Sequence, residues 1–339
     1  MIFKLLTTSV FLILTTRVTY CQPYTNLVLE GAGIRGVAYA GAIQYLEESQ
    51  RIQQIEKVGG TSVGAIAALA ISLGYSARDI QTLMYDTKLQ KFNDGKFFFI
   101  GGLARLNRKY GWYRGKACTR WQEKVIAAKT GNTDITFLEL HERGFKDLYV
   151  TGTSLNRQRM LVFSRLNYPD MRVKDAVRIS MSIPLYFEAI AIDGRGQILP
   201  RNHCETDYDL VVDGGLIGNF PITIFDSLTF KGGDTNRAIN PYTLGLRIDT
   251  PEQIASDSLR QGLAPVPIYR FKNYVAAFYS FVIENLNRPS LTEGDWNRTV
   301  SISSGSIGPK IKRLSEAEKN LLIANGYVAT RYFFDRRKY

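Results

Sequence analysis

Two successive strand–turn–helix units near the amino terminus constrain the fold of this chain more than any other feature. In each unit a short apolar run enters a glycine-rich turn, and the turn is followed by apolar residues at helical spacing. The units occupy Asn26–Glu48 and Ile55–Leu73, and Gly74 follows the second helix. Repeated units of this kind place their strands in parallel, with helices packed on the sheet. The sequence therefore predicts an α/β fold with a mainly parallel central sheet.

Further elements follow the same pattern along the chain. More strands are expected at Leu148–Thr153, Met160–Ser164, Leu210–Val212 and Thr243–Ile248, and helices at Tyr274–Leu286 and Glu316–Asn325. We predict a catalytic domain over residues 26–228, with a cap insertion at about 86–145. Residues 229–339 are expected to form a C-terminal helical extension that packs on the core.

The first 21 residues have the pattern of a secretory signal. A basic start is followed by the apolar run Leu5–Leu14, which is too short to span a bilayer, with a cleavage position just before Gln22. We expect an exported protein that is secreted, periplasmic or associated with the envelope. Lipid anchoring at Cys21 is the less favoured alternative, because bulky Tyr20 precedes it. No later segment reads as transmembrane.

Neither the net charge nor the number of cysteines identifies a binding partner or a disulfide bond. The chain has 43 Lys and Arg against 31 Asp and Glu, a formal charge of +12. This excess suits an anionic partner, and it also serves solubility alone. Three cysteines cannot build a disulfide framework, although Cys118 and Cys204 could pair after export or remain free thiols.

The predicted cap contains an apolar segment, Lys96–Leu103, followed by basic residues interleaved with aromatic ones up to Arg120. Such a segment could touch a lipid surface and phosphate head groups. The same mixture could bind single-stranded nucleic acid, which we disfavour. The interpretation we prefer is an ordinary helical cap with its apolar side facing inward.

The first glycine turn, Gly31–Gly36, matches G-x-G-x-x-G between a strand and a helix. A glycine turn at a helix start presents free backbone N–H groups to negative charge. It can therefore hold the pyrophosphate of a dinucleotide or form an oxyanion hole. Glu56 has the spacing of a ribose-binding acid, but it begins its strand instead of ending it. This motif alone does not choose between the two functions.

The second glycine turn, Gly60-Thr61-Ser62-Val63-Gly64, matches the G-x-S-x-G nucleophile elbow in its strand–turn–helix context. The sharp turn brings neighbouring backbones too close for a Cβ at the glycine positions, so that Ser62 projects alone. A helix start also favours negative charge that develops nearby. The alternative is a tight turn with a capping serine.

A serine nucleophile needs a base, and the sequence offers few candidates. The chain has two histidines: His141 lies in a charged helical stretch and is expected to face solvent, and His203 lies in a polar loop. No histidine follows Asp213, which ends an apolar strand and precedes Gly214 and Gly215. Open α/β sheets build their sites at the carboxyl ends of strands, which makes Asp213 the candidate base, although Asp-Gly is also a common turn.

These three motifs, in this order and each after a strand, resemble those of the patatin-like phospholipases. The resemblance covers Asn26–Pro221 and includes Ser180–Pro184, which is similar to the Ser/Pro segment of the family. It implies a three-layer α/β/α fold and a serine lipid acyl hydrolase that uses a Ser–Asp dyad without histidine, cofactor or metal. The implied substrate is a phospholipid or another acyl lipid, with peripheral contact to a membrane surface and no nucleic acid partner.

The resemblance also assigns roles to individual residues. Ser62 would attack the ester carbonyl, and Asp213 would accept its proton and later activate water. The implied oxyanion hole comprises Gly31, Ala32, Gly33, Arg35 and Gly36, with the N–H groups of Ala32 and Gly33 as the first donors and Val63 N–H as a further one. Gly60 and Gly64 shape the elbow, and Gly214 and Gly215 the loop after Asp213. Ala32 departs from the family, in which many members have a third glycine.

Two other functions remain as rivals at this point. One is a catalytically idle protein that binds acyl chains without hydrolysing them. The other is a dinucleotide-binding protein, which the position of Glu56 disfavours and which leaves Gly60–Gly64 unexplained.

Overall fold

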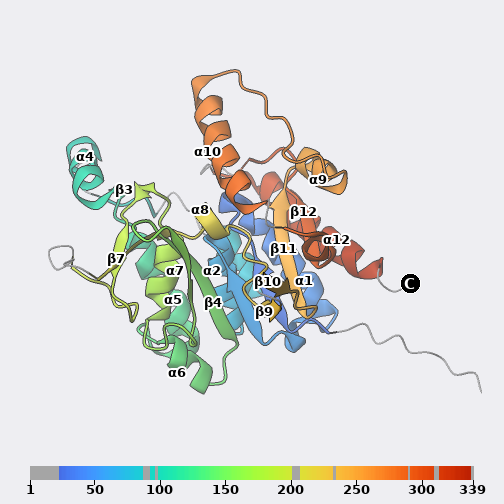
Figure 1. Cartoon of the computed structure of the whole chain (residues 1–339), viewed down its shortest axis with the longest axis horizontal. Helices are drawn as coiled ribbons and strands as arrows, with labels where there is room; N and C mark the ends of the chain where they lie inside the picture. Colours follow the sequence, from blue (N-terminus) through green and yellow to red (C-terminus); the bar gives the residue numbers. More distant parts are fainter. Residues whose placement is uncertain are drawn as a thin grey trace, which may run out of the picture.

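The computed structural model describes residues 23–86, 92–95, 98–200, 207–231, 234–288, 291–308 and 313–336. The expected signal sequence, Cys21, His203 and Cys204 lie outside the described residues. The central sheet has eight strands, with helices packed against it (Figure 1).

The sheet strands are β1 (Asn26–Leu29), β2 (Lys57–Gly60), β4 (Asp147–Ser154), β5 (Arg159–Phe163), β7 (Ile190–Ile192), β8 (Asp209–Asp213), β11 (Thr243–Asp249) and β12 (Thr299–Ser303). Two small sheets pair β3 (Gly111–Tyr113) with β6 (Leu185–Phe187) and β9 (Ser227–Lys231) with β10 (Asp234–Ala238).

The helices before β8 are α1 (Ala38–Glu48), α2 (Val63–Ser72), α3 (Ala77–Asp86), α4 (Phe98–Lys109), α5 (Lys116–Thr130), α6 (Phe137–Glu142) and α7 (Val173–Ser180), with the short 3-10 helices η1 (Gly33–Val37) and η2 (Ile52–Gln54). Those after β8 are α8 (Gly215–Gly218), α9 (Pro251–Ser258), α10 (Phe271–Asn287), α11 (Glu293–Asn297) and α12 (Glu316–Asp335).

The order of the central sheet confirms the α/β fold class. It runs β12-β11-β1-β2-β4-β8-β7, with β5 also paired to β4. The pairs from β12 to β4 are parallel, whereas β5, β8 and β7 join in antiparallel pairs. The division at residue 228 stays a prediction. The chain beyond it contributes β11 and β12 to the sheet, and β11 pairs with β1.

Most expected elements are confirmed within one or two residues, and the differences have local causes. β2 includes both Gly59 and Gly60, because the parallel partners on either side hold its backbone regardless of side chains. β12 was not anticipated, since its short alternating sequence has little signal outside the sheet. The last helix, α12, extends to Asp335, well past the expected Asn325.

The two faces of the sheet are covered unequally. Leu27 and Leu29 of β1 point into the main core, which also contains the buried residues of α1, α2 and α7. All ten residues of α2 are buried, as its apolar sequence predicts. Val28 faces the other way, into a small cluster with Phe220 and Ile222. Helix α2, which follows the nucleophile elbow, therefore packs on the more thickly covered face of the sheet.

The segment predicted as a cap contains α4, β3, α5 and α6. Helix α5 packs on α7 and buries Cys118, Val125 and Ile126, as expected of a helical cap with its apolar side inward. Within the described part of the chain, no helix is long and apolar enough to cross a membrane.

Candidate active site

Ser62 occupies the sharp turn between β2 and α2. Its backbone has φ 54° and ψ −123°, a left-handed conformation that is strained for a residue with a side chain. A Cβ at Gly60 would lie 2.4 Å from the Gly64 carbonyl oxygen, and one at Gly64 would lie 2.4 Å from that of Leu29. Both flanking glycines are therefore required by close backbone contacts, which is the geometry expected of a nucleophile elbow.

Asp213 reaches Ser62 because β2 and β8 end opposite each other along one side of β4. Val150 of β4 pairs with Gly60 on one side and with Phe163 of β5 on the other. Gly152 pairs with Asp213 and also with β5, so β2 and β8 share the side of β4 away from β5. The two strands run toward each other, and their carboxyl ends meet.

Asp213 ends its strand, as the sequence predicts. Strand β8 is antiparallel to β4, however, so the site does not form at a common edge of parallel strands. Asp213 lies near the nucleophile because β8 is short and stops where β2 stops. Thr61 follows β2 and Thr151 belongs to β4. Their hydroxyl groups share a 2.6 Å hydrogen bond close to where β2 and β8 end.

The Ser62 and Asp213 side chains lie close enough together for the Ser62 hydroxyl group to lower the pKa of Asp213. Both are almost completely buried, with 8% and 6% of their surfaces exposed. The Asp213 carboxylate also accepts a hydrogen bond of 2.8 Å from Gly215 N–H. Burial raises the pKa of Asp213 from 3.8 to about 7, while the hydrogen bond from Gly215 and the nearby Ser62 hydroxyl group oppose that rise. A carboxyl group with this pKa can hold or release a proton near neutral pH.

The end of α7 and the residues that follow it hold Ser62 and Asp213 in place through hydrogen bonds to their backbone N–H groups. Ser180 Oγ accepts a 2.8 Å hydrogen bond from Ser62 N–H, and the Ser182 carbonyl accepts one of 2.9 Å from Asp213 N–H. Between them, Met181 Sδ lies 3.8 Å from Ser62 Oγ. This is the Ser/Pro segment of the family resemblance, and it holds the nucleophile and the carboxylate in register.

The first glycine turn lies against Ser62. A Cβ at Gly31 would lie 3.4 Å from Ser62 Cβ and 2.4 Å from Asn219 Oδ1. Gly31 N–H is already donated to the Asn219 carbonyl at 2.9 Å. Gly33 has φ 55°, and Gly36 lies against Val63, whose Cγ1 would be 2.2 Å from a Cβ there. Gly31 and Gly36 thus allow close packing.

Two N–H groups of this turn remain for a ligand. Neither Ala32 N–H nor Gly33 N–H has a hydrogen-bond partner within the described part of the chain. The Ala32 side chain is buried, so the methyl group that departs from the family pattern points away from solvent.

Arg35 is hydrogen-bonded to the backbone of the same turn. It is buried, and its Nε donates to the Ala32 carbonyl at 3.2 Å. The guanidinium group also lowers the pKa values of Glu30 and Asp249 by its charge, although burial has the largest effect on both. Arg35 therefore stabilises the backbone that presents Ala32 N–H.

We expect Arg35→Ala to lower kcat about tenfold to a hundredfold with little change in KM. The lost hydrogen bond from a charged donor contributes about 1.5–3 kcal/mol, and its loss leaves the turn less well positioned for the transition state. Steady-state kinetics with a soluble ester test this expectation. An effect confined to KM would instead place Arg35 at the substrate head group.

Asn219 and Asn287 form a brace that sequence analysis missed. Asn287, in the last turn of α10, accepts a 2.6 Å hydrogen bond from Asn219 N–H. Its Nδ2 donates to the carbonyls of Ile283, Gly215 and Leu216 at 2.6, 3.3 and 3.4 Å. The loop after Asp213 is therefore tied to α10, an interaction for which neither asparagine gives a local sequence signal.

A buried charged cluster lies under the first glycine turn. Glu30, directly before Gly31, accepts a 3.1 Å hydrogen bond from Ile248 N–H and lies 3.5 Å from Arg247 Nη2. Arg247 also pairs with Asp249 at 2.7 Å and with Glu284 of α10 at 3.0 Å. Burial raises the pKa of Glu30 to about 8. The cluster joins β1, β11 and α10 at the base of the site.

The described residues contain one histidine, and it lies outside this site. His141, on α6, is half-exposed as expected, and its Nδ1 lies 2.9 Å from Asp147 Oδ1. Among the residues that the structure describes, no group of three or more His, Cys, Asp or Glu side chains could hold a metal ion. Glu56 lies exposed just before β2, at the opposite end of the strand from Ser62.

Comparison with known proteins identifies the family. The model of the patatin-like phospholipase family matches residues 27–226. The chain belongs to the patatin-like phospholipase family. The match contains both glycine turns, the Ser180–Pro184 segment and Asp213, and family membership supports lipid hydrolase activity.

Relatives of this patatin-like chain include viral proteins. An uncharacterized protein of Acanthamoeba polyphaga mimivirus, R571, is 31% identical over 253 residues, which cover 74% of this chain and 73% of the relative. A probable lipid hydrolase of Invertebrate iridescent virus 6, 463L, is 28% identical, with 59% of this chain and 63% of the relative covered. The crystal structure of VipD from Legionella pneumophila has a TM-score of 0.57 at 16% identity, over 93% of this chain and 67% of VipD, and so shares the fold.

Proposed function

We propose that this patatin-like protein hydrolyses carboxylic esters of phospholipids or other acyl lipids through a Ser62–Asp213 dyad. The meeting of the ends of β2 and β8, which brings these two buried side chains together, carries the proposal. The strained backbone of Ser62 supports it, because a strained, projecting serine is typical of a nucleophile and unnecessary for a capping residue.

In the first half-reaction, Ser62 Oγ attacks the ester carbonyl while Asp213 accepts the hydroxyl proton. The developing oxyanion receives hydrogen bonds from Ala32 N–H and Gly33 N–H, with Val63 N–H as a further donor. Asp213 then returns the proton to the leaving alcohol oxygen as the C–O bond breaks. The products of this step are the alcohol or lysophospholipid and an acyl group bound to Ser62.

In the second half-reaction, Asp213 accepts a proton from a water molecule, and the resulting hydroxide attacks the acyl carbonyl. Collapse of the intermediate releases the fatty acid and returns the proton to Ser62. A base with a pKa of about 7 is well matched to both proton transfers at neutral pH.

A fluorophosphonate probe tests the proposal directly, because it forms a covalent bond only with an activated serine. We expect labelling of the wild-type chain and none of Ser62→Ala. Absence of labelling in folded wild-type protein, with detergent present to open the site, would favour an idle lipid-binding protein instead.

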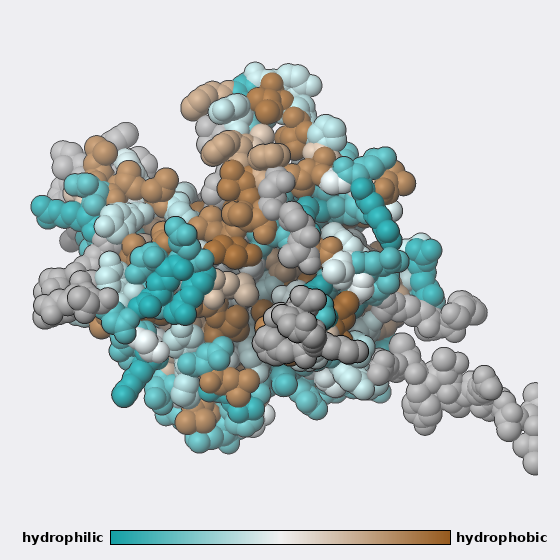
Figure 2. All heavy atoms as spheres, viewed as in Figure 1, coloured by the Kyte–Doolittle hydropathy of each residue, from teal (hydrophilic) through white to brown (hydrophobic). Residues whose placement is uncertain are grey.

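We further propose that α10 brings the site to a lipid surface. Its exposed apolar side chains include Phe271, Phe278 and Phe281, with exposed fractions of 82%, 62% and 61%. Figure 1 shows α4 and α10 projecting from the side of the molecule that carries α8, and Figure 2 shows apolar residues over both helices. An exposed apolar surface beside the site, on a chain of charge +12, suits an anionic bilayer.

Replacing Phe278 and Phe281 with aspartate should weaken binding to vesicles of phosphatidylglycerol and phosphatidylcholine. Each buried phenylalanine contributes about 1.5–3 kcal/mol, so the partition coefficient should fall about a hundredfold or more. Sedimentation with vesicles, in the Ser62→Ala background, measures the effect without lipid degradation. Val328→Asp, at an exposed apolar position of α12, is the matched control and should bind as before. Equal binding by the double variant would contradict this role of α10.

We retain export as a proposal. It rests on the sequence pattern of residues 1–21, and amino-terminal sequencing of the mature protein tests it. A mature protein that begins at Gln22 would agree with cleavage, whereas a lipid-modified Cys21 would indicate anchoring.

A further inference from the structure

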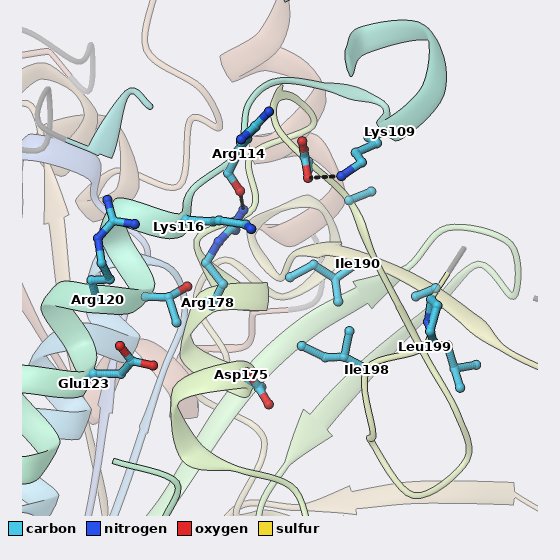
Figure 3. Close-up of a pocket in the computed structure, with 15 residues that line it drawn as sticks. Lys109, Arg114, Lys116, Arg120, Glu123, Asp175, Arg178, Ile190, Ile198 and Leu199 are labelled. Atoms are coloured by element: carbon cyan, nitrogen blue, oxygen red, sulfur yellow. Dashed lines mark hydrogen bonds and ion pairs between the residues drawn. The ribbon is translucent and has the colours of Figure 1, made fainter. Parts of the chain in front are cut away.

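A cavity of about 540 Å³ has a lining that includes neither Ser62 nor Asp213. Its walls come from the first turns of α5, from Asp175 and Arg178 of α7 and from the edge strand β7 (Figure 3). Lys116 and Arg178 end on one side of the cavity in this view, and Ile190 and Ile198 lie on the other. Cavities of this size hold small organic ligands.

The charges around this cavity do not balance. The three acidic side chains that line it have cations of their own: Glu123 pairs with Lys174, Asp175 with Arg172 and Glu188 with Lys109. Four further basic side chains line the cavity and have no acidic partner within 4 Å in the described part of the chain: Arg114, Lys116, Arg120 and Arg178. The cavity thus has an excess of positive charge beside an apolar wall.

Arg178 makes this excess hard to explain without a ligand. It is buried, with 5% of its surface exposed, and its hydrogen bonds go to neutral acceptors: Nη1 to Ser182 Oγ at 2.5 Å and Nη2 to the Arg114 carbonyl at 2.7 Å. The charges of Asp94 and Glu188 act on Arg178 from farther away, but no acidic side chain in the described part of the chain pairs with it within 4 Å. A buried cation without a direct ion pair is costly, because it has lost hydration with little compensation from opposite charge. A bound anion would supply that charge.

The same arginine connects the cavity to the dyad. Its partner Ser182 accepts the hydrogen bond from Asp213 N–H through its carbonyl. Ser180, two residues after Arg178 in the chain, accepts the hydrogen bond from Ser62 N–H. A ligand that moves the Arg178 guanidinium group therefore acts on the segment that positions both reactive residues.

We propose that this cavity binds a phosphate ester, with the phosphate between Lys116 and Arg178 and the organic part against Ile190 and Ile198. The ester comes from one of two sources, the head group of a phospholipid or a free phosphorylated small molecule. Binding is coupled to Ser62 and Asp213 through Ser182, and that coupling rests on the proposed function.

Calorimetric titration of the Ser62→Ala chain with glycerol 3-phosphate and with AMP tests the site without requiring hydrolysis. We expect binding of at least one probe, weakened about tenfold or more in Lys116→Ala/Arg120→Ala, because the variant loses one cation at the phosphate and a second that lines the cavity. Lys124→Ala, an exposed lysine on the same helix outside the cavity, is the matched control and should bind as wild type. Lys116→Met, which keeps the apolar stem, should also bind more weakly.

Kinetics with the otherwise wild-type chain distinguish the two sources. For a free ligand, AMP should change kcat for a soluble neutral ester, and this response should disappear in the double variant. For a lipid head group, the double variant should raise KM for phosphatidylglycerol and leave the neutral ester unaffected. Failure of both probes to bind, or equal binding by the double variant, would overturn the proposal. Neither result would bear on fluorophosphonate labelling of Ser62, which tests the hydrolase separately.

Discussion

Ser62→Ala should abolish ester hydrolysis, with a loss in kcat/KM of about 10⁴-fold or more, and leave the fold intact. Ser62 Oγ is the only heavy atom removed, and the acyl-enzyme route cannot proceed without it. The alanine keeps the Cβ, so that the strained backbone of the elbow is unchanged. Release of fatty acid from phospholipid micelles and hydrolysis of a soluble ester each measure the expected loss of activity.

His141→Ala provides the control for this result. His141 lies on α6, is half-exposed and pairs with Asp147 of β4, so its removal should leave hydrolysis unchanged. Comparable activity in the Ser62→Ala and wild-type chains would exclude Ser62 as the nucleophile. A large loss on replacing His203, which lies outside the described residues, would point to a catalytic triad in place of the dyad.

Asp213→Asn should have an effect nearly as large, lowering kcat about 10⁴-fold, because the amide keeps the shape but cannot accept the serine proton. In the wild-type chain, kcat/KM for a soluble ester should rise as pH increases through about 7, since Asp213 must be ionised to act as the base. The low activity of the Asn variant should lack this rise. A wild-type profile that is flat from pH 5 to pH 9 would contradict the assignment.

The same substitution should stabilise the protein at neutral and alkaline pH. The folded pKa of Asp213, about 7, lies above its ordinary value of 3.8, so the folded state binds the proton more tightly than the unfolded state. This carboxyl group therefore destabilises the fold progressively as pH rises from about 4 to about 7, and fully above that, by on the order of a few kcal/mol.

Denaturant unfolding at pH 5 and pH 8 measures this difference. Asp213→Asn should increase the free energy of unfolding at pH 8 more than at pH 5. Asp170→Asn, at an exposed loop position, is the control and should have no such pH dependence. Equal effects of the Asp213 substitution at both pH values would show that the carboxyl group is not desolvated in the folded state.

The sequence by itself determined the local parts of the site. The elbow at Gly60–Gly64 follows from turn chemistry within a few residues, since two glycines are needed where backbones approach closely around Ser62. The buried helix behind it follows from its unbroken apolar sequence. Asp213 could be named because it ends an apolar strand before two glycines, and the family resemblance joined these separate signals into one site.

Only the tertiary structure decided how these parts meet. That β8 runs against β4 and stops opposite the end of β2 depends on strand pairing between distant segments, which leaves no local pattern. The same holds for the brace at Asn287 and for the buried Arg247 cluster, in which Glu30 and Glu284 each lie more than thirty residues from Arg247 in the chain. Local signals report short-range backbone preferences, whereas partners of buried polar groups are chosen by the packing of the whole chain.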